Sequence, residues 1–148
     1  MVAFRQRLYS IGWKRMNASR FFDTNVLLYL LSGDQAKANA AETLVASGGI
    51  VSVQVLNEFA SVATRKLHML IPEVREILAT VRRLCTVHSL SVESHDEGLE
   101  VADRYQLSVY DAMIVASAHQ AGCKSLYTED LQDGMAILGL TIRNPFNA

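Results

Sequence analysis

The chain has 148 residues, of which 50% are hydrophobic and 20% are charged, and its mean hydropathy is +0.15. This length is typical of a single domain of about 100–200 residues, which can bury a core without disulfides or metal. The composition, with only 2 prolines, excludes a disordered chain, and no apolar run approaches the ~20 residues of a membrane span.

The net charge of -1 is unevenly distributed along the chain. Residues 1–20 contain five bases and no acid, whereas residues 21–148 contain nine bases and fifteen acids, which gives +5 and -6. We expect residues 1–19 to be a basic, flexible N-terminal extension and residues 20–148 to form one domain. The extension could precede a start at Met16, touch RNA or pack on a partner, and it lacks the features of a secretory signal.

In chain order, short apolar runs alternate with segments of helical periodicity. We expect strands at residues 20–23, 50–52, 86–90, 125–128 and 141–143. We expect helices at residues 26–31, 34–47, 55–67, 72–84, 91–105 and 110–121. The last of these helices is apolar on nearly all sides and should be deeply buried. Strands alternating with helices predict an α/β domain with a mainly parallel sheet.

Two acids follow expected strands. Asp23 comes directly after Phe21 and Phe22, and Asp130 follows the strand at residues 125–128. In open α/β sheets, ligands bind beyond the carboxyl ends of the strands. Both acids are therefore candidates for a binding site.

Two further acids interrupt apolar helical segments. Glu58 lies three residues after Val55 and four before Val62, beside the expected core stripe. Asp111 opens the apolar helix, and Ile114 lies at its i+3 position, so its side chain should face inward. The helix N-terminus can offset about 0.3–1 kcal/mol of the cost of burying that charge.

Each acid taken alone also allows a structural role. Asp23 could cap the following helix, Asp111 could be a cap or first-turn acid, Glu58 could pair with Arg65, and Asp130 could be a turn residue. Together, however, the four would converge on one pole of a small α/β domain. Four close carboxylates cannot all stay ionised without a cation. A hard divalent ion, Mg²⁺ or Mn²⁺, is the natural partner, and such a site performs phosphate chemistry.

Other sequence signals are weak or absent. No P-loop, GxGxxG, HExxH or GxSxG motif occurs, and the four histidines lack metal-ligand spacing, so surface or capping roles are expected for His68, His88, His95 and His119. Cys85 and Cys123 form no CxxC pair and are typical of reduced, buried thiols in a cytoplasmic protein.

Four motifs occur in an order that resembles a known family: FDTNVLL at residues 22–28, VLNEF at 55–59, SVYDAMI at 108–114 and LYTEDL at 126–131. With them, the sequence resembles the PIN-domain ribonucleases over about residues 20–146, and most of all the VapC-type toxins of toxin–antitoxin modules. The resemblance implies a three-layer α/β/α fold with a mainly parallel five-stranded sheet.

The resemblance also implies the site. The family's acidic quartet falls on Asp23, Glu58, Asp111 and Asp130, which would be both catalytic and metal-binding residues. Supporting roles fall on Thr128, whose hydroxyl lies beside the last acid, and on Thr24 and Asn25, which would order the first turn. Asp133 and Glu129 are expected to be solvated.

The implied reaction is Mg²⁺- or Mn²⁺-dependent hydrolysis of an RNA phosphodiester. The three aspartates would hold the ion, directly or through water, and Glu58 would complete the ligand set or orient the attacking water. The resemblance implies a homodimer and a small antitoxin whose arginine could enter the acidic pocket. Bases such as Arg65, Lys66, Arg82 and Arg83 could contact RNA phosphates.

Three alternatives remain at this point. One is a PIN nuclease that processes RNA outside a toxin module, and another is a catalytically inactive PIN module that only binds. The third is a receiver-like signalling domain, which would need an acidic pair after the first strand, a phosphoacceptor Asp after a central strand and a late lysine. Here Asp23 stands alone, and Lys124 precedes its strand.

Overall fold

The computed structural model describes residues 19–147. The predicted extension at residues 1–19 therefore lies, apart from Ser19, outside the described residues. The elements run in the order β1 (Arg20–Phe22), α2 (Thr24–Tyr29), α3 (Gln35–Ala46), β2 (Gly49–Ser52), α4 (Val53–Arg65), α5 (Ile71–Leu84), β3 (Cys85–His88), α6 (Val92–Tyr105), α7 (Val109–Gln120), β4 (Ser125–Tyr127), β5 (Ala136–Ile137) and β6 (Leu140–Arg143).

The strands form one sheet in the order β3-β2-β1-β4-β6-β5, and all neighbouring strands pair in parallel except β5 and β6. The prediction of a mainly parallel sheet is thus confirmed for its five predicted strands. The short antiparallel strand β5 adds a sixth. Leu138 and Gly139 join β5 to β6, both with positive φ (51° and 80°), as a two-residue hairpin turn requires. A strand of two residues is too short to give a periodic signal.

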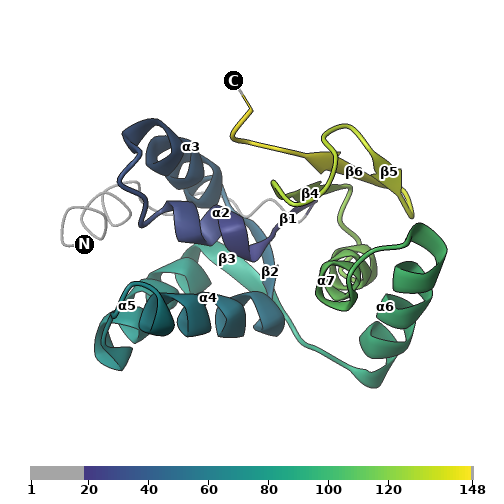
Figure 1. Cartoon of the computed structure of the whole chain (residues 1–148), viewed down its shortest axis with the longest axis horizontal. Helices are drawn as coiled ribbons and strands as arrows, with labels where there is room; N and C mark the ends of the chain where they lie inside the picture. Colours follow the sequence, from purple (N-terminus) through teal and green to yellow (C-terminus); the bar gives the residue numbers. More distant parts are fainter. Residues whose placement is uncertain (1–18, 148) are drawn as a thin grey trace.

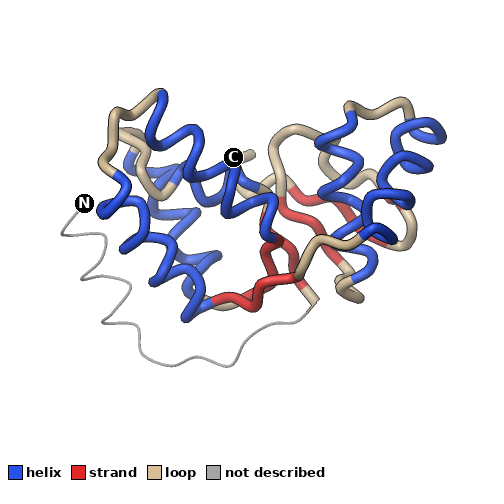
Figure 2. Tube along the Cα trace, turned by 90° about the horizontal axis from the view of Figure 1, so that it is seen from below, coloured by secondary structure: helices blue, strands red, loops and turns tan. Residues whose placement is uncertain are grey.

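Helices cover both faces of the sheet (Figures 1 and 2). The connections from β1 to β2 and from β2 to β3 carry α2 to α5, which pack on one another and on the sheet. The chain then crosses back from β3 to β4 through α6 and α7, which pack together as an antiparallel pair on the opposite face. The predicted three-layer architecture is confirmed, and β1, β2 and β4 lie at its centre.

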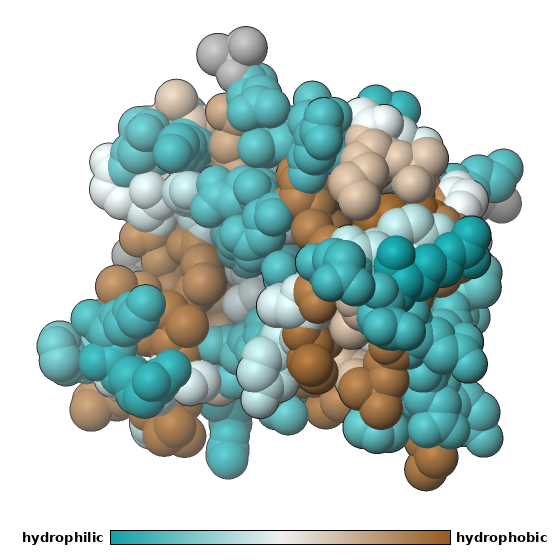
Figure 3. Space-filling model, turned by 45° about the vertical axis from the view of Figure 1, so that its right-hand side comes forward, coloured by the Kyte–Doolittle hydropathy of each residue, from teal (hydrophilic) through white to brown (hydrophobic). Residues whose placement is uncertain are grey.

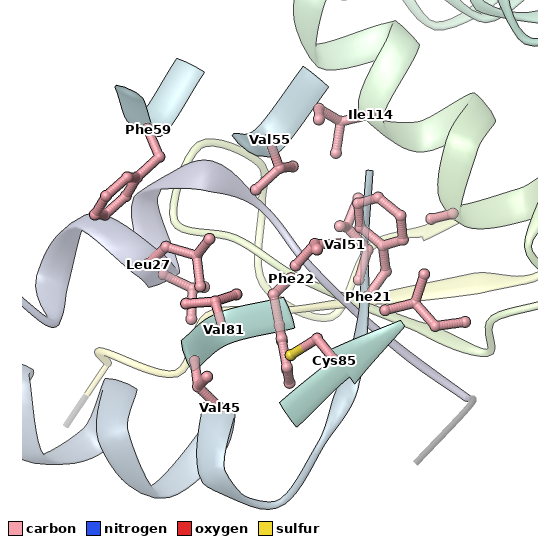
Figure 4. Packing of buried hydrophobic residues seen from close by; sticks show 14 of the residues in the cluster. Phe21, Phe22, Leu27, Val45, Val51, Val55, Phe59, Val81, Cys85 and Ile114 are labelled. Carbon is pink, nitrogen blue, oxygen red and sulfur yellow. The ribbon is translucent and has the colours of Figure 1, made fainter. Parts of the chain in front are cut away.

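The core forms on both faces of the central strands. Phe21 and Phe22 alternate along β1 and are both fully buried because helices cover both sides. Figure 4 shows Phe22 beside Cys85. Cys85 and Cys123 are free, buried thiols, as expected. Among the described residues, no helix combines the length and the apolar character that crossing a membrane would need.

Side-chain caps set several helix boundaries. Asp23 caps α2 directly, so this helix begins at Thr24, before the expected start at residue 26. Asp34 accepts hydrogen bonds from the amides of residues 36 and 37 and begins α3, as predicted. Ser91 caps α6, so this helix begins at Val92, one residue after the expected start at residue 91. Ser52 and Ser108 cap α4 and α7.

Gly49 lies where β2 passes closest to β1. A Cβ atom at this residue would lie 2.7 Å from the buried Phe22 ring and 3.0 Å from the Arg20 carbonyl oxygen, whereas a Cβ at Gly33 would meet nothing within 4 Å. We predict that Gly49→Ala lowers the free energy of unfolding by about 1–3 kcal/mol because the rigid core cannot yield. Gly33→Ala should be neutral or slightly stabilising. Urea denaturation checks both, and equal stability of the two variants would contradict the packing described here.

Candidate functional site

Two neighbouring strands end at the base of the candidate site. β1 and β4 pair in parallel with Phe22 opposite Tyr127, so the residues that follow them leave the same edge of the sheet. The Asp23 amide donates a hydrogen bond to the Tyr127 carbonyl oxygen at 3.0 Å. This pairing places Asp23 beside the loop that carries Thr128 and Asp130.

The buried Thr128 hydroxyl connects the two loops. It donates to Asp23 Oδ2 at 2.8 Å and accepts from the Asp130 amide at 3.0 Å. Asn25 Nδ2 donates to the Thr128 hydroxyl and to Asp130 Oδ2, both at 3.1 Å. The structure therefore brings Asn25 and Thr128, two of the predicted supporting residues, into direct contact with predicted acids.

Glu58 enters the site from α4. Its carboxylate accepts one hydrogen bond from the Thr24 hydroxyl at 2.7 Å and another from Gln54 Nε2 at 2.8 Å. Thr24 is thus the third predicted supporting residue that contacts a predicted acid. Gln54 lies one helical turn before Glu58, and its contact fixes the carboxylate from the other side.

Asp111 lies in the first turn of α7 and is half-buried. The Ser108 hydroxyl caps this helix by accepting a hydrogen bond from the Asp111 amide at 3.2 Å. The predicted burial of this helix holds for Ala112 and for Ile114 to Ala118, but not for its start, because Tyr110 is 72% exposed. The first turn of α7, which contains Asp111, therefore lies at the surface of the domain.

The four predicted acids share one cavity of about 290 Å³, together with Arg65 and Tyr110. Asp23, Asp111 and Asp130 each offer a carboxylate oxygen, and these atoms lie within 4.8 Å of one another. Glu58 lines the same cavity but is not in that group of three. The convergence expected from four separate sequence positions is observed.

Burial raises the pKa of two of these acids. Asp23 is 5% exposed, and desolvation raises its pKa from 3.8 to about 7. The hydrogen bonds from Thr128 and Thr24 act in the opposite direction, and the charges of Asp130 and Glu58 raise the pKa further. Desolvation also raises the pKa of Asp111. The cavity therefore concentrates negative charge that its own hydrogen bonds do not fully stabilise.

These residues suit a hard divalent cation. Three carboxylates at this spacing are the oxygen donors that Mg²⁺ and Mn²⁺ prefer. A cation would stabilise the ionised form of buried Asp23, and Thr128 and Asn25 already orient the carboxylates.

Other candidates lie outside this cluster. Of the four bases named as possible phosphate contacts, Arg65 lines the cavity, and Lys66, Arg82 and Arg83 are not among its lining residues. Exposed Glu129 accepts hydrogen bonds from the Tyr29 hydroxyl, and Asp133 accepts one from the Asn144 amide. The ring of His119 pairs with Glu97. No histidine of residues 19–147 joins the acids.

Sequence reasoning missed three residues around the site: Gln54, Ser108 and Tyr110. The spacing of Ser108 three residues before Asp111 is a capping signal, and Gln54 lies at i-4 from Glu58. The exposure of Tyr110 left no signal because the apolar run around it favours burial.

The family model described as PIN domain matches residues 20–132. The chain belongs to the PIN domain family. The matched residues of this PIN domain include all four acids. From the sequence alone, Asp23 and Asp130 are expected to follow strands, and Asp111 is expected to open a helix. No curated protein matches the sequence.

Solved structures share the fold. The PIN domain is similar to a toxin–antitoxin complex from Klebsiella pneumoniae, with 24% identity, TM-score 0.67, and coverage of 88% of this chain and 100% of that one. Mycobacterium tuberculosis VapC20, a sarcin–ricin loop cleaving toxin, matches with 20% identity and TM-score 0.57, and the match covers 73% of this chain and 87% of that one. Rickettsia felis VapBC2 bound to a promoter DNA fragment matches with 17% identity and TM-score 0.62, and the match covers 84% of this chain and 97% of that one.

The raised pKa of Asp23 predicts that, without metal, the natural chain and Asp23→Asn differ in the free energy of unfolding, and that this difference depends on pH. Because the folded chain holds this proton more tightly than the unfolded chain, the stabilisation is full below pH about 4 and is lost as the pH rises through about 7. In chelator at pH 8, Asp23→Asn should therefore unfold with a free energy higher than that of the natural chain by up to about 4 kcal/mol. The difference should vanish near pH 4.

Urea denaturation at the two pH values measures this effect. Glu129→Gln is the matched control, since Glu129 is an exposed neighbouring acid, and it should show no such difference. An Asp23→Asn variant that is less stable than the natural chain at pH 8 would contradict the burial of an unstabilised carboxylate.

Proposed function

We propose that this PIN domain is a divalent-metal-dependent endoribonuclease in which Asp23, Asp111 and Asp130 hold Mg²⁺ or Mn²⁺. The observation that supports this most strongly is the group of three carboxylate oxygens within 4.8 Å of one another, in a cavity that also contains Glu58. The presence of all four acids in one cavity favours a nuclease over a PIN module that only binds.

When bound, the ion would supply charge stabilisation for the phosphate and a lowered pKa for water. The protein's own part is positioning. Thr128 and Asn25 hold the carboxylates of Asp23 and Asp130 in place. Glu58 has both oxygens fixed by hydrogen bonds from neighbouring side chains, so its remaining lone pairs can accept a hydrogen bond from water in a defined direction.

Hydrolysis adds one water across a phosphorus–oxygen bond of the RNA backbone. The water oxygen bonds to phosphorus, the bond to the leaving ribose oxygen breaks, and a proton passes from the water to that oxygen. The carboxylates lining the cavity are the groups that can carry this proton. Preorganised groups matter here because the reaction is limited by positioning and charge stabilisation.

We further propose that the protein is the toxin of a toxin–antitoxin module and that it pairs with a second copy of itself. The fold is shared with solved structures of a toxin and of toxin–antitoxin complexes. Residues 21–148 carry a net charge of -6, and four of their acids line one cavity. An arginine of the antitoxin would be attracted to this cavity and would block it.

Exposed apolar side chains support contact with protein partners. Figure 3 shows one face of the molecule on which apolar residues emerge in patches between hydrophilic areas. In the loop after α4 and at the first residue of α5, Leu67, Leu70 and Ile71 are 48%, 66% and 58% exposed. Large exposed apolar residues grouped in one segment are typical of interaction surfaces.

We predict that Asp23→Asn, Asp111→Asn and Asp130→Asn each lower the cleavage rate of RNA more than about 100-fold, because each removes a direct metal ligand. Glu58→Gln should lower it by about 10–100-fold, as expected for a group that acts through water. Purified protein with Mg²⁺ or Mn²⁺, and the same protein in chelator, provide the measurement. Sequencing of RNA cut after expression in cells identifies the substrate.

Glu129→Gln is the control, because Glu129 is an acid of the same loop that contacts Tyr29 and does not line the cavity. It should cleave like the natural chain.

In cells, the natural chain should arrest growth, and Asp111→Asn should not. Cleavage that continues in chelator, or an Asp111→Asn variant with undiminished activity, would contradict the proposal.

A further inference from the structure

We propose that Tyr110 and Arg65 position the RNA at this site, with the Tyr110 ring stacking on a nucleobase and the Arg65 guanidinium binding a backbone phosphate. This inference rests on the proposed nuclease function and assigns the residues that hold its substrate. Both side chains line the same cavity as the four acids, and they come from two different helices, α7 and α4.

The Tyr110 ring is presented to solvent by a fixed backbone. The residue is 72% exposed, although Ala112 and the residues from Ile114 to Ala118 in the same helix are buried. Its carbonyl oxygen accepts a hydrogen bond from Gln54 Nε2 at 3.2 Å, and the same nitrogen contacts Glu58. An aromatic ring is therefore held at the entrance of the acidic cavity, directly before Asp111.

Arg65 provides the positive charge that this cavity otherwise lacks. Its Nε donates to the Ser61 hydroxyl at 3.0 Å and to the Ser61 carbonyl oxygen at 3.3 Å, which directs the guanidinium along α4. Within the described part of the chain it forms no ion pair with a carboxylate. Its remaining N–H groups are thus free to bind a phosphate, for which a guanidinium is well suited.

Tyr110 is held near the beginning of α4, and Arg65 is the last residue of that helix. Gln54, which holds the Tyr110 backbone, lies eleven residues before Arg65 in α4, a distance of about 16 Å along the helix axis. Glu58 lies between them on α4. The Arg65 side chain bonds Ser61, one turn back toward Gln54, so its guanidinium lies nearer to Gln54 than its backbone does. RNA that contacts both side chains passes the acids that line the same cavity.

RNA is a better occupant for this surface than a second protein. A base has a π-face for the ring and a backbone phosphate for the guanidinium, and both groups must pass beside the acids if the phosphodiester is cut there. A protein partner would explain the exposed ring without requiring any change in cleavage. This difference makes the two occupants separable by kinetics.

The test of Tyr110 measures KM and kcat on an RNA oligonucleotide that the natural chain cleaves. Tyr110→Ala should raise KM about 5- to 150-fold, as loss of one stacked base does. Tyr110→Phe should retain the natural KM, and Tyr110→Leu should not. Val109→Ala is the control, because Val109 is an exposed neighbour that does not line the cavity.

Abasic substitution identifies the stacked nucleotide. Replacing one nucleotide at a time should reveal a position where removing the base weakens cleavage by the natural chain, while the same removal has no further effect on Tyr110→Ala. Effects that add at every position would show that the ring does not stack on a base, and would overturn this assignment.

The test of Arg65 measures the dependence of kcat/KM on salt. Arg65→Gln should reduce the slope of log(kcat/KM) against log[salt] by about 0.7, the value for one phosphate contact on a single strand. Lys66→Gln removes an adjacent exposed charge outside the cavity and should leave the slope unchanged. Equal slopes for Arg65→Gln and the natural chain would overturn the phosphate contact.

The two levels of the proposal fail differently. If the natural chain cleaves RNA and Tyr110→Ala and Arg65→Gln cleave it equally well, this inference is wrong and the nuclease function stands. If Tyr110→Ala changes only the association state or partner binding, the ring belongs to a protein interface and the inference is again wrong. If the natural chain cleaves no RNA, both proposals fail together.

Discussion

The cost of burying the Asp23 carboxylate is the constraint on which the site depends. Parallel pairing of β1 with β4 places this acid at the same sheet edge as Asp130, and α7 brings Asp111 to them. Desolvation and like charge raise the Asp23 pKa to about 7. Hydrogen bonds from Thr128 and Thr24 offset only part of this effect, so the fold is stabilised most fully when a proton or a cation neutralises the cluster.

This constraint also reconciles an acidic body with a proposed RNA substrate. The -6 over residues 21–148 would repel a polyanion if it were spread evenly. Part of that charge is gathered in one cavity, where divalent ions would turn the most negative spot into a phosphate-binding one. Arg65 is the basic residue that lines this cavity. On this account, metal and a few local side chains bind the phosphate in place of a broadly basic surface.

Much of this arrangement could be predicted from the sequence. The four acids were identifiable because each interrupts or ends an apolar run, and parallel strands bring such residues to one edge. The beginnings of the helices near Asp34 and Ser91 were also predicted, because both residue types cap helices. The strand β5 and the exposed ring of Tyr110 were not, since one is too short for periodicity and the other lies in a helix whose composition favours burial. Contacts such as Gln54 with Tyr110 join residues far apart in sequence, and no local pattern encodes them.

The most direct test of the account is the location of a bound metal. Crystals grown with Mn²⁺ would give an anomalous difference signal that marks the ion. We expect one peak at bonding distance from carboxylate oxygens of Asp23, Asp111 and Asp130, and we expect it to be lost in Asp111→Asn crystals. A Mn²⁺ ion bound elsewhere, or no ion at the cluster in protein that cleaves RNA with Mn²⁺, would contradict it.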